Sequence, residues 1–115
     1  MEIVRKGKYT DVTANDEKGA GNANHFYCIS TAKEPTAILG QVQFQSGAIL
    51  EQGVNGVTNE DLLAVVIHRL QGFQSGNFKC RENAIALTKI EEALMWLESR
   101  TQKREARGVE GKEIV

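Results

Sequence analysis

The sequence feature that most restricts the fold is a pair of helical apolar patterns joined by a short glycine-containing loop. In the first pattern Thr58 is a suitable N-cap residue, and Asp61 stands three positions later, where a capping box places an acidic partner. Gly72 and Gly76 mark the end of this pattern. Its apolar residues recur at spacings that place them on one stripe of a helix: Leu62, Leu63, Val66, Leu70 and Phe73.

The second helical pattern is longer, beginning near Cys80 and ending at Gly108. Two helices joined by a short loop run antiparallel, so residues 58–108 predict an αα-hairpin. The longer helix leaves an unpaired face that includes Met95 and Trp96. We expect a second copy to cover this face, which would make the protein homo-oligomeric. The apolar seam of the second pattern consists of Ala84, Leu87, Ile90, Ala93, Leu94 and Leu97.

A small antiparallel sheet is predicted for residues 25–52. The segment 25–30 is aromatic and β-compatible, and Glu34-Pro35-Thr36 then supplies a turn. In the next segment Val42 and Phe44 alternate with glutamines, as a half-buried strand requires.

The predicted organisation is a single domain over residues 1–115 with an α+β fold. A tight turn at Ser46-Gly47 predicts a third strand over residues 48–51. Residues 1–24 are polar and glycine-containing, so we expect a polar arm or a loose loop there. The small antiparallel β-sheet is then followed by the long antiparallel αα-hairpin.

Composition excludes several classes of protein. A net charge of -1 argues against a protein that coats a nucleic acid polymer. No apolar run is long enough to span a bilayer and no signal-peptide pattern begins the chain, so we expect a soluble cytoplasmic protein without a membrane partner. Cys28 and Cys80 are too few for a disulfide framework or a zinc site and are expected to be reduced.

An enzymatic function is not expected, because the usual catalytic motifs are absent. His68 has no nearby acid at a helpful spacing and is interpreted as a solvent-facing or interface residue. The acid pairs Glu60-Asp61 and Glu91-Glu92 are adjacent in sequence, so the members of each pair point to different faces of a helix. We predict no catalytic residue, no metal site and no cofactor.

Two segments could bind an anion. Arg100, Lys103, Arg104 and Arg107 follow one another at spacings of three and four and form a cationic stripe. One interpretation is a phosphate clamp, for which the planar arginine fork is suited; the other is stabilisation by the helix macrodipole. Gly53-Val54-Asn55-Gly56 before a capped helix weakly suggests a phosphate cradle, although simple turn chemistry explains it as well.

At the opposite end of the hairpin, Phe73 and Asn83 could hold a purine by stacking and by edge hydrogen bonds. The alternatives are an aromatic plug under the loop and a polar residue at a helix start. Asn83 and Arg100 are 17 positions apart, so they lie about 25 Å apart on one helix. If both ends serve one ligand, an antiparallel dimer must bring the tip of one hairpin to the base of another, giving two equivalent interface sites.

The segments GVTNEDLL, RLQGFQSGNFKCRENA and RTQKREARGVEG resemble the helical-hairpin domain of phage Thoeris anti-defence proteins, a domain shared with sponges that counter cyclic-oligonucleotide (CBASS) signalling. The resemblance covers about the last two-thirds of the chain. It implies that the protein sequesters, without cleavage, a glycocyclic ADP-ribose made by Thoeris TIR enzymes in the cytoplasm of the infected bacterial host. Anti-phage defence would thereby be inhibited.

The resemblance also implies roles for particular residues. Phe73 and Asn83 match the positions expected to hold the purine, and Arg100 and Arg104 match those expected to hold the phosphates. Family members assemble into hexamers, some with a second site for cyclic trinucleotides, for which Arg81 is the candidate here. The alternative function is a protein–protein inhibitor that binds a host defence enzyme directly. A hydrolase that degrades the signal is a third hypothesis, disfavoured by the lack of catalytic groups.

Overall fold

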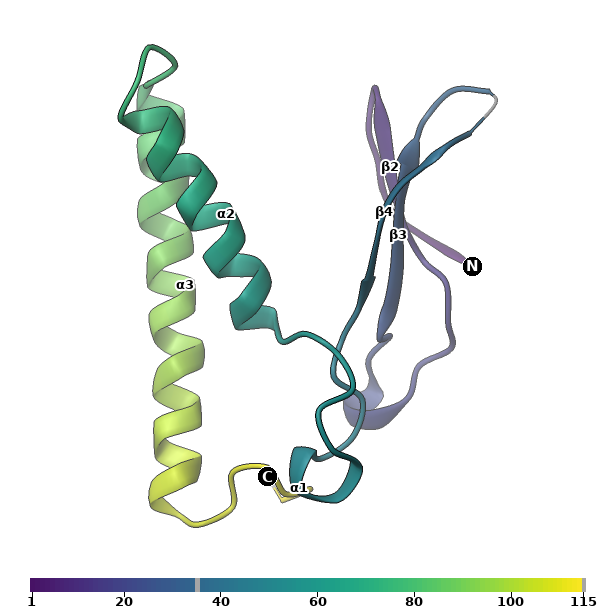
Figure 1. The fold of residues 1–115 in the computed structure, drawn as a ribbon, viewed down its shortest axis with the longest axis vertical. Helices are drawn as coiled ribbons and strands as arrows, with labels where there is room; N and C mark the ends of the chain where they lie inside the picture. Colours follow the sequence, from purple (N-terminus) through teal and green to yellow (C-terminus); the bar gives the residue numbers. More distant parts are fainter. Residues whose placement is uncertain (35, 115) are drawn as a thin grey trace. The chain divides into compact units, whose positions relative to one another are not determined.

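The computed structural model of this chain describes residues 1–34 and 36–114 and has an α+β fold (Figure 1). The chain divides into two compact units, Met1–Val57 and Thr58–Val115, which we call the sheet unit and the hairpin unit. The predicted order of an antiparallel sheet followed by an αα-hairpin is confirmed. The junction between the units falls at the N-cap of the first predicted helix.

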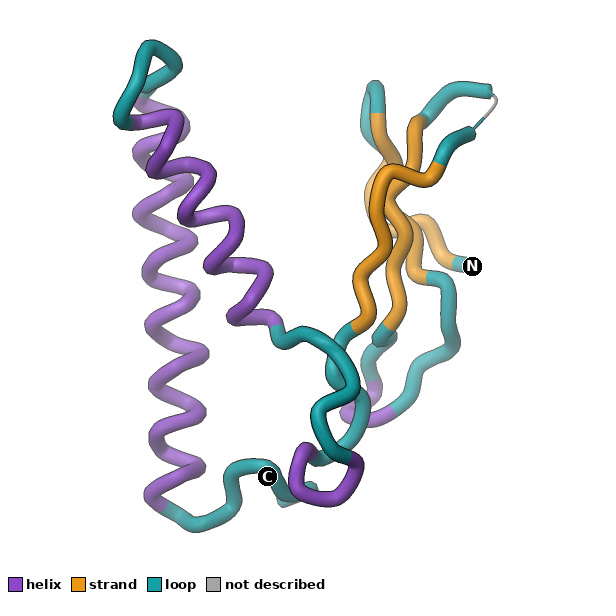
Figure 2. The backbone as a smooth tube through the Cα atoms, in the orientation of Figure 1, coloured by secondary structure: helices purple, strands orange, loops and turns teal. Residues whose placement is uncertain are grey.

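The described residues of the sheet unit contain four strands, one more than predicted (Figure 2). They are β1 (Glu2–Lys6), β2 (Thr10–Ala14), β3 (Phe26–Thr31) and β4 (Ile38–Gln43), and they lie in the order β1-β2-β3-β4 with every pair antiparallel. The turn predicted at residues 34–36 includes residue 35, which lies outside the described residues.

The prediction of a polar arm over residues 1–24 is wrong, because this segment holds β1, β2 and the short 3-10 helix η1 (Ala20–Asn22). The pairing partners explain the error. Val12 of β2 lies opposite Ile29 of β3, so β2 gains its ladder from a strand that follows it by more than ten residues. The amide of Gly7 donates to the carbonyl of Thr10 at 3.0 Å and closes the first hairpin. Polar residues are tolerated in β1 because it is an exposed edge strand.

The predicted third strand at residues 48–51 is also wrong, because this segment forms the single-turn helix α1 (Ile49–Gln52). The amide of Gln52 donates to the carbonyl of Ala48 at 2.7 Å, and Gly53 ends the turn with a φ of 74°. A run of four residues is too short for its periodicity to separate a strand from a helical turn. Instead of this segment, it is Val57 that pairs with Phe44, in an isolated parallel β-bridge.

The alternation predicted around Val42 is confirmed as far as Phe44: Val42 and Phe44 are half-buried, whereas Gln41 and Gln43 are exposed. Gln45, predicted on the same face as these glutamines, is half-buried, and its Nε2 donates to the carbonyls of Gly47 and Gly53. The ring of Phe44 packs edge-on against Tyr27, with centroids 5.6 Å apart.

The hairpin unit consists of α2 (Asn59–Gln74) and α3 (Arg81–Ala106), which pack against each other. The predicted capping box is confirmed, since the Thr58 hydroxyl accepts from the Asp61 amide at 3.2 Å and the Asp61 carboxylate accepts from the Thr58 amide at 2.9 Å. After α3, Gly108 has the predicted left-handed conformation, with a φ of 72°.

Most of the predicted seam residues of the hairpin are half-buried. In α2, however, Val66 is 42% exposed and Ile67 takes the half-buried position beside it, so the stripe differs from the predicted one at this single position. In α3 the alanines Ala84 and Ala93 are exposed. The residues that form the seam in the structure are Leu62, Leu63, Ile67, Leu70, Phe73, Leu87, Ile90, Leu94 and Leu97.

α3 has 26 residues and α2 has 16, so the last part of α3 extends past the start of α2, as predicted. After α3 and residues 107–108, the chain continues as residues 109–114, which we call the C-terminal segment. Met95 and Trp96 are 53% and 60% exposed within this chain. Within the described part of the chain, no helix is both long enough and apolar enough to cross a membrane.

Candidate ligand-binding site

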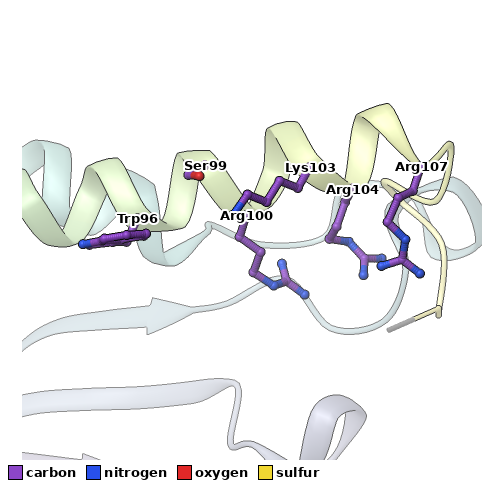
Figure 3. A pocket seen from close by; sticks show the side chains of 6 residues that line it. All are labelled: Trp96, Ser99, Arg100, Lys103, Arg104 and Arg107. Atoms are coloured by element: carbon purple, nitrogen blue, oxygen red, sulfur yellow. The ribbon is translucent and has the colours of Figure 1, made fainter.

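The last turns of α3 carry the predicted cationic stripe along an open hollow of about 350 Å³. Figure 3 shows the side chains of Trp96, Arg100, Arg104 and Arg107 extending to the same side of the helix. This alignment follows from the sequence, because residues four and eight positions apart share one face of an α-helix. The hollow is lined by Trp96, Ser99, Arg100, Lys103, Arg104 and Arg107.

Arg104 differs from the other cations of the stripe because it is buried, with 9% of its surface exposed. Its Nη2 donates to the carbonyl oxygens of Val109, at 3.0 Å, and Lys112, at 2.8 Å. Its Nη1 donates to the carbonyl oxygen of Ile114. Its Nε donates to the Glu110 carboxylate at 3.3 Å, which also makes an ion pair. The guanidinium thus fastens the C-terminal segment to the end of α3.

These bonds leave Arg104 little capacity for another partner. A guanidinium has five N–H groups, and four of those on Arg104 donate within the chain. By contrast, Arg100, Lys103 and Arg107 are exposed, and none of them makes an ion pair with residues 1–34 or 36–114. The positive charge that the hollow offers to a ligand therefore comes mainly from these three side chains.

The opposite end of the hairpin is built around Phe73, in the last turn of α2. The ring is half-buried; it lies edge-on to Phe78, with centroids 6.4 Å apart, and the Arg69 guanidinium lies 4.9 Å from its centroid. The Gln74 side chain bridges the loop, because its Nε2 donates to the Cys80 carbonyl at 3.1 Å and its Oε1 accepts from the Cys80 amide at 3.0 Å. Phe78 is 77% exposed, so this tip presents an accessible aromatic surface.

Asn83 stands in the first turn of α3, directly after the loop. Its backbone amide donates to the Cys80 Sγ at 3.4 Å, which caps the helix start, and its side chain is half-buried. Arg81 lies on a different face of the same turn, beside an open hollow of about 310 Å³ that is also lined by Ala84, Ile85, Thr88 and Lys89.

The structure therefore separates the predicted site residues into three groups. Phe73 and Asn83 lie at the loop end of the hairpin, and Arg81 faces its own hollow. Arg100 and Arg104 line the hollow near the other end of α3. Since α3 is one uninterrupted helix, the 17 residues between Asn83 and Arg100 correspond to about 25 Å along its axis. One chain does not bring the two ends together.

Other features singled out in the sequence have structural roles. The Gly53–Gly56 segment is held by side chains of its own loop: Asn55 Oδ1 accepts from the Ser46 amide at 2.8 Å, and Gln45 Nε2 donates to the Gly53 carbonyl at 2.8 Å. These bonds favour the turn interpretation over the phosphate cradle. His68 is exposed, as predicted. Across residues 1–34 and 36–114, no group of three or more His, Cys, Asp or Glu side chains could hold a metal ion.

Comparison with known proteins assigns the hairpin to a family. The family model described as Acb2/Tad1, hairpin domain, matches residues 38–102, which is more than half of the chain. This chain belongs to the Acb2/Tad1 hairpin-domain family. The resemblance read from the sequence is thereby confirmed.

A similar protein is Thoeris anti-defense 1 of Bacillus phage SBSphiJ7. It is 60% identical to this chain over 81 residues, which are 70% of this chain and 57% of that protein. The chain thus spans a little over half the length of this relative. The Acb2/Tad1 match begins at the start of β4 and includes Phe73, Asn83 and Arg100, whereas Arg104 and Arg107 lie just beyond its end.

Two residues of the cationic hollow, Trp96 and Ser99, were not predicted as site residues. Trp96 was noted only as part of an unpaired helix face. Its spacing from Arg100 could have assigned Trp96 to the hollow. The two residues are four positions apart and therefore share a face of α3. The burial of Arg104 had no comparable signal, since its partners belong to a segment without helical periodicity.

Proposed function

We propose that this protein captures a cyclic nucleotide-derived signal of bacterial anti-phage defence and holds it without cleaving it. The signal proposed is glycocyclic ADP-ribose made by Thoeris TIR enzymes. Two findings support the proposal: membership of the Acb2/Tad1 hairpin-domain family and similarity to a phage protein named Thoeris anti-defense 1. The protein would act in the cytoplasm of the infected host.

The observation that carries the proposal is the hollow on α3 with exposed cations. Arg100, Lys103 and Arg107 line it and make no ion pair with the described residues. A pyrophosphate would provide the missing counter-charge, and arginine forks bind its oxygens with paired, charge-assisted hydrogen bonds. The volume of about 350 Å³ lies at the small end of the range for small-molecule sites.

We propose that a second copy completes the site. Phe73 and Asn83 of one subunit would hold the purine, and Arg100 of the other would hold the phosphates, because one chain keeps these groups about 25 Å apart. The exposed Met95 and Trp96 provide apolar surface for such an association. Two equivalent sites per dimer follow from twofold symmetry, and dimers could assemble further into hexamers.

A role for Arg104 in this site needs a rearrangement. Its guanidinium holds the C-terminal segment, so a phosphate would have to replace the carbonyl oxygens of Val109 and Lys112. Arg100 is therefore the stronger candidate for the first phosphate contact. Arg81, beside its separate hollow, remains the candidate for a second site that takes cyclic oligonucleotides.

Native mass spectrometry tests the proposal, because it reports subunit count and ligand stoichiometry together. The protein is measured alone, with isomers of cyclic ADP-ribose and with cyclic trinucleotides. We expect an oligomer that gains one glycocyclic ADP-ribose per interface site. Heating the complex and recovering the ligand intact would support capture, whereas recovery of a linear product would indicate hydrolysis.

The second candidate function is direct inhibition of a host defence enzyme through a protein–protein interface. The exposed Met95 and Trp96 favour it, since a partner protein could cover them as well as a second copy could. Thermal unfolding separates the two functions. A ligand that binds only the folded state raises the melting temperature, so glycocyclic ADP-ribose stabilises a sponge and leaves a pure protein inhibitor unchanged.

A further inference from the structure

Trp96 places a large aromatic ring at the edge of the cationic hollow. Its side chain is exposed to 60%, although tryptophan is usually well covered in folded proteins. The residue lines the same hollow as Arg100 and extends from α3 to the same side (Figure 3). An exposed ring beside unpaired cations is the arrangement expected of a site for a ligand that has both a ring and negative charge.

The spacing between ring and charge fits one nucleotide. Trp96 and Arg100 are four residues apart, which corresponds to about 6 Å along α3 and places both on one face. This length is comparable to the distance between the base of a nucleotide and its 5′-phosphate. Asn83, by contrast, is about 25 Å from Arg100 on the same helix. A single subunit thus carries a ring platform within reach of its own phosphate-binding side chains.

We infer that Trp96 is a specificity-determining residue whose indole stacks on the base of a nucleotide while Arg100, Lys103 and Arg107 hold its phosphates. This inference rests on the proposed function and adds a contact to it. Stacking is selective for a ring over a bare anion, because an inorganic phosphate or pyrophosphate has no flat face to lie on the indole. Each subunit therefore distinguishes nucleotides from simple phosphates before a partner subunit contributes.

Trp96 is the single tryptophan of the chain, so intrinsic fluorescence reports on it alone. Wild-type protein is titrated with ADP-ribose and, separately, with inorganic pyrophosphate, following tryptophan emission and, in parallel, calorimetric heat. We expect ADP-ribose to quench the emission and saturating pyrophosphate to leave it nearly unchanged. Sedimentation at the same concentrations verifies that the subunit count does not change with ligand.

Three variants make the test specific. Trp96→Ala is expected to weaken ADP-ribose binding by about 5- to 150-fold, the range for loss of one base–aromatic stack, and to leave pyrophosphate binding within about twofold. Trp96→Phe keeps a ring and should restore most of the affinity. Tyr9→Ala is the matched control, because Tyr9 is an aromatic residue of the sheet unit that is 74% exposed and does not line the hollow.

The outcomes separate this inference from the proposed function. If neither probe binds wild-type protein, the stacking inference is wrong, and the proposed function is then decided by the separate measurement with glycocyclic ADP-ribose. If ADP-ribose binds wild type and Trp96→Ala equally well, or if pyrophosphate quenches as strongly as ADP-ribose, capture stands and the stacking role is wrong. Equal losses for Tyr9→Ala and Trp96→Ala would assign the effect to the loss of any exposed aromatic side chain, which also overturns the inference.

Discussion

Replacement of Arg100 by alanine tests the phosphate-binding hollow most directly. Arg100 is exposed and makes no ion pair with the described residues, so its removal leaves no buried partner unsatisfied. We therefore expect the free energy of unfolding to change by less than about 0.5 kcal/mol. Ligand binding should change far more, because Arg100 would donate to a charged phosphate oxygen.

The size of that effect follows from the type of bond. A hydrogen bond to a charged group contributes about 1.5–3 kcal/mol, which corresponds to a loss of about ten- to a hundredfold in affinity. Arg100→Lys retains the charge but lacks the planar fork, so an intermediate loss is expected. Isothermal titration calorimetry with glycocyclic ADP-ribose measures the dissociation constants, and chemical denaturation measures the unfolding free energies.

The matched control is Arg5→Ala, which removes the same charge from the exposed strand β1 in the sheet unit. If Arg100→Ala binds the ligand as tightly as wild type, the hollow on α3 is not the phosphate site. If Arg5→Ala loses as much affinity as Arg100→Ala, the effect reflects net charge and the reasoning from local geometry is refuted.

Three further predictions concern stability. Arg104→Lys should lower the free energy of unfolding by about 1–3 kcal/mol in urea denaturation, since a lysine cannot reach all the acceptors of the C-terminal segment; an unchanged midpoint would show that the segment is not held by this guanidinium. Gly56→Ala should cost about 1–3 kcal/mol, because an added Cβ would lie 2.4 Å from the carbonyl carbon of Phe44; wild-type melting behaviour would contradict this. The backbone amide of His25 donates to the Asp16 carboxylate at 2.9 Å and is the main cause that lowers the pKa of Asp16 below its ordinary 3.8. The contribution of the Asp16 carboxylate to stability is therefore present above pH 3.8 and lost as the pH falls below that value. Between pH 7 and pH 3, the stability of Asp16→Asn should thus fall by less than that of the wild type. An identical fall in the two proteins would contradict this role of Asp16.

The hairpin could be predicted from the sequence because its signals are local. The capping box at Thr58 and Asp61 spans three residues, and the apolar seam repeats within each helix. The error at Val66 is of one position, and it arose because three consecutive apolar residues, at positions 65–67, leave the stripe ambiguous. The exposed alanines of α3 are small enough to occupy either face.

The N-terminal strands were missed although β1 and β2 form a local hairpin, because β2 also depends on a partner strand that is distant in the sequence. Residues of β2 find their partners in β3, across an intervening loop that includes η1. Neither β1 nor β2 has the strong apolar alternation that marked β4, so their polar composition was interpreted as a lack of structure. The single turn of α1 was missed for another reason: four residues make only one helical turn, so no apolar spacing can recur within it.

For the candidate site, too, local sequence signals could be used and distant contacts could not. The cationic stripe followed from spacing alone, and the hollow does lie along it. The burial of Arg104 depends on acceptors five to ten residues later in an irregular segment, which no periodicity announces.

The attachment of the C-terminal segment has a consequence for how this part of the chain can change. Three of the acceptors on Arg104 are main-chain carbonyls, at Val109, Lys112 and Ile114, and every amino acid has such a carbonyl. Point substitutions at these three positions therefore preserve the acceptors, so the residue type there can change without loss of these hydrogen bonds. Insertion or deletion of one residue after Gly108 would shift all three carbonyls at once. At these three positions the spacing from Arg104 therefore matters more than the identity of the residue, whereas Glu110 bonds to Arg104 through its side chain.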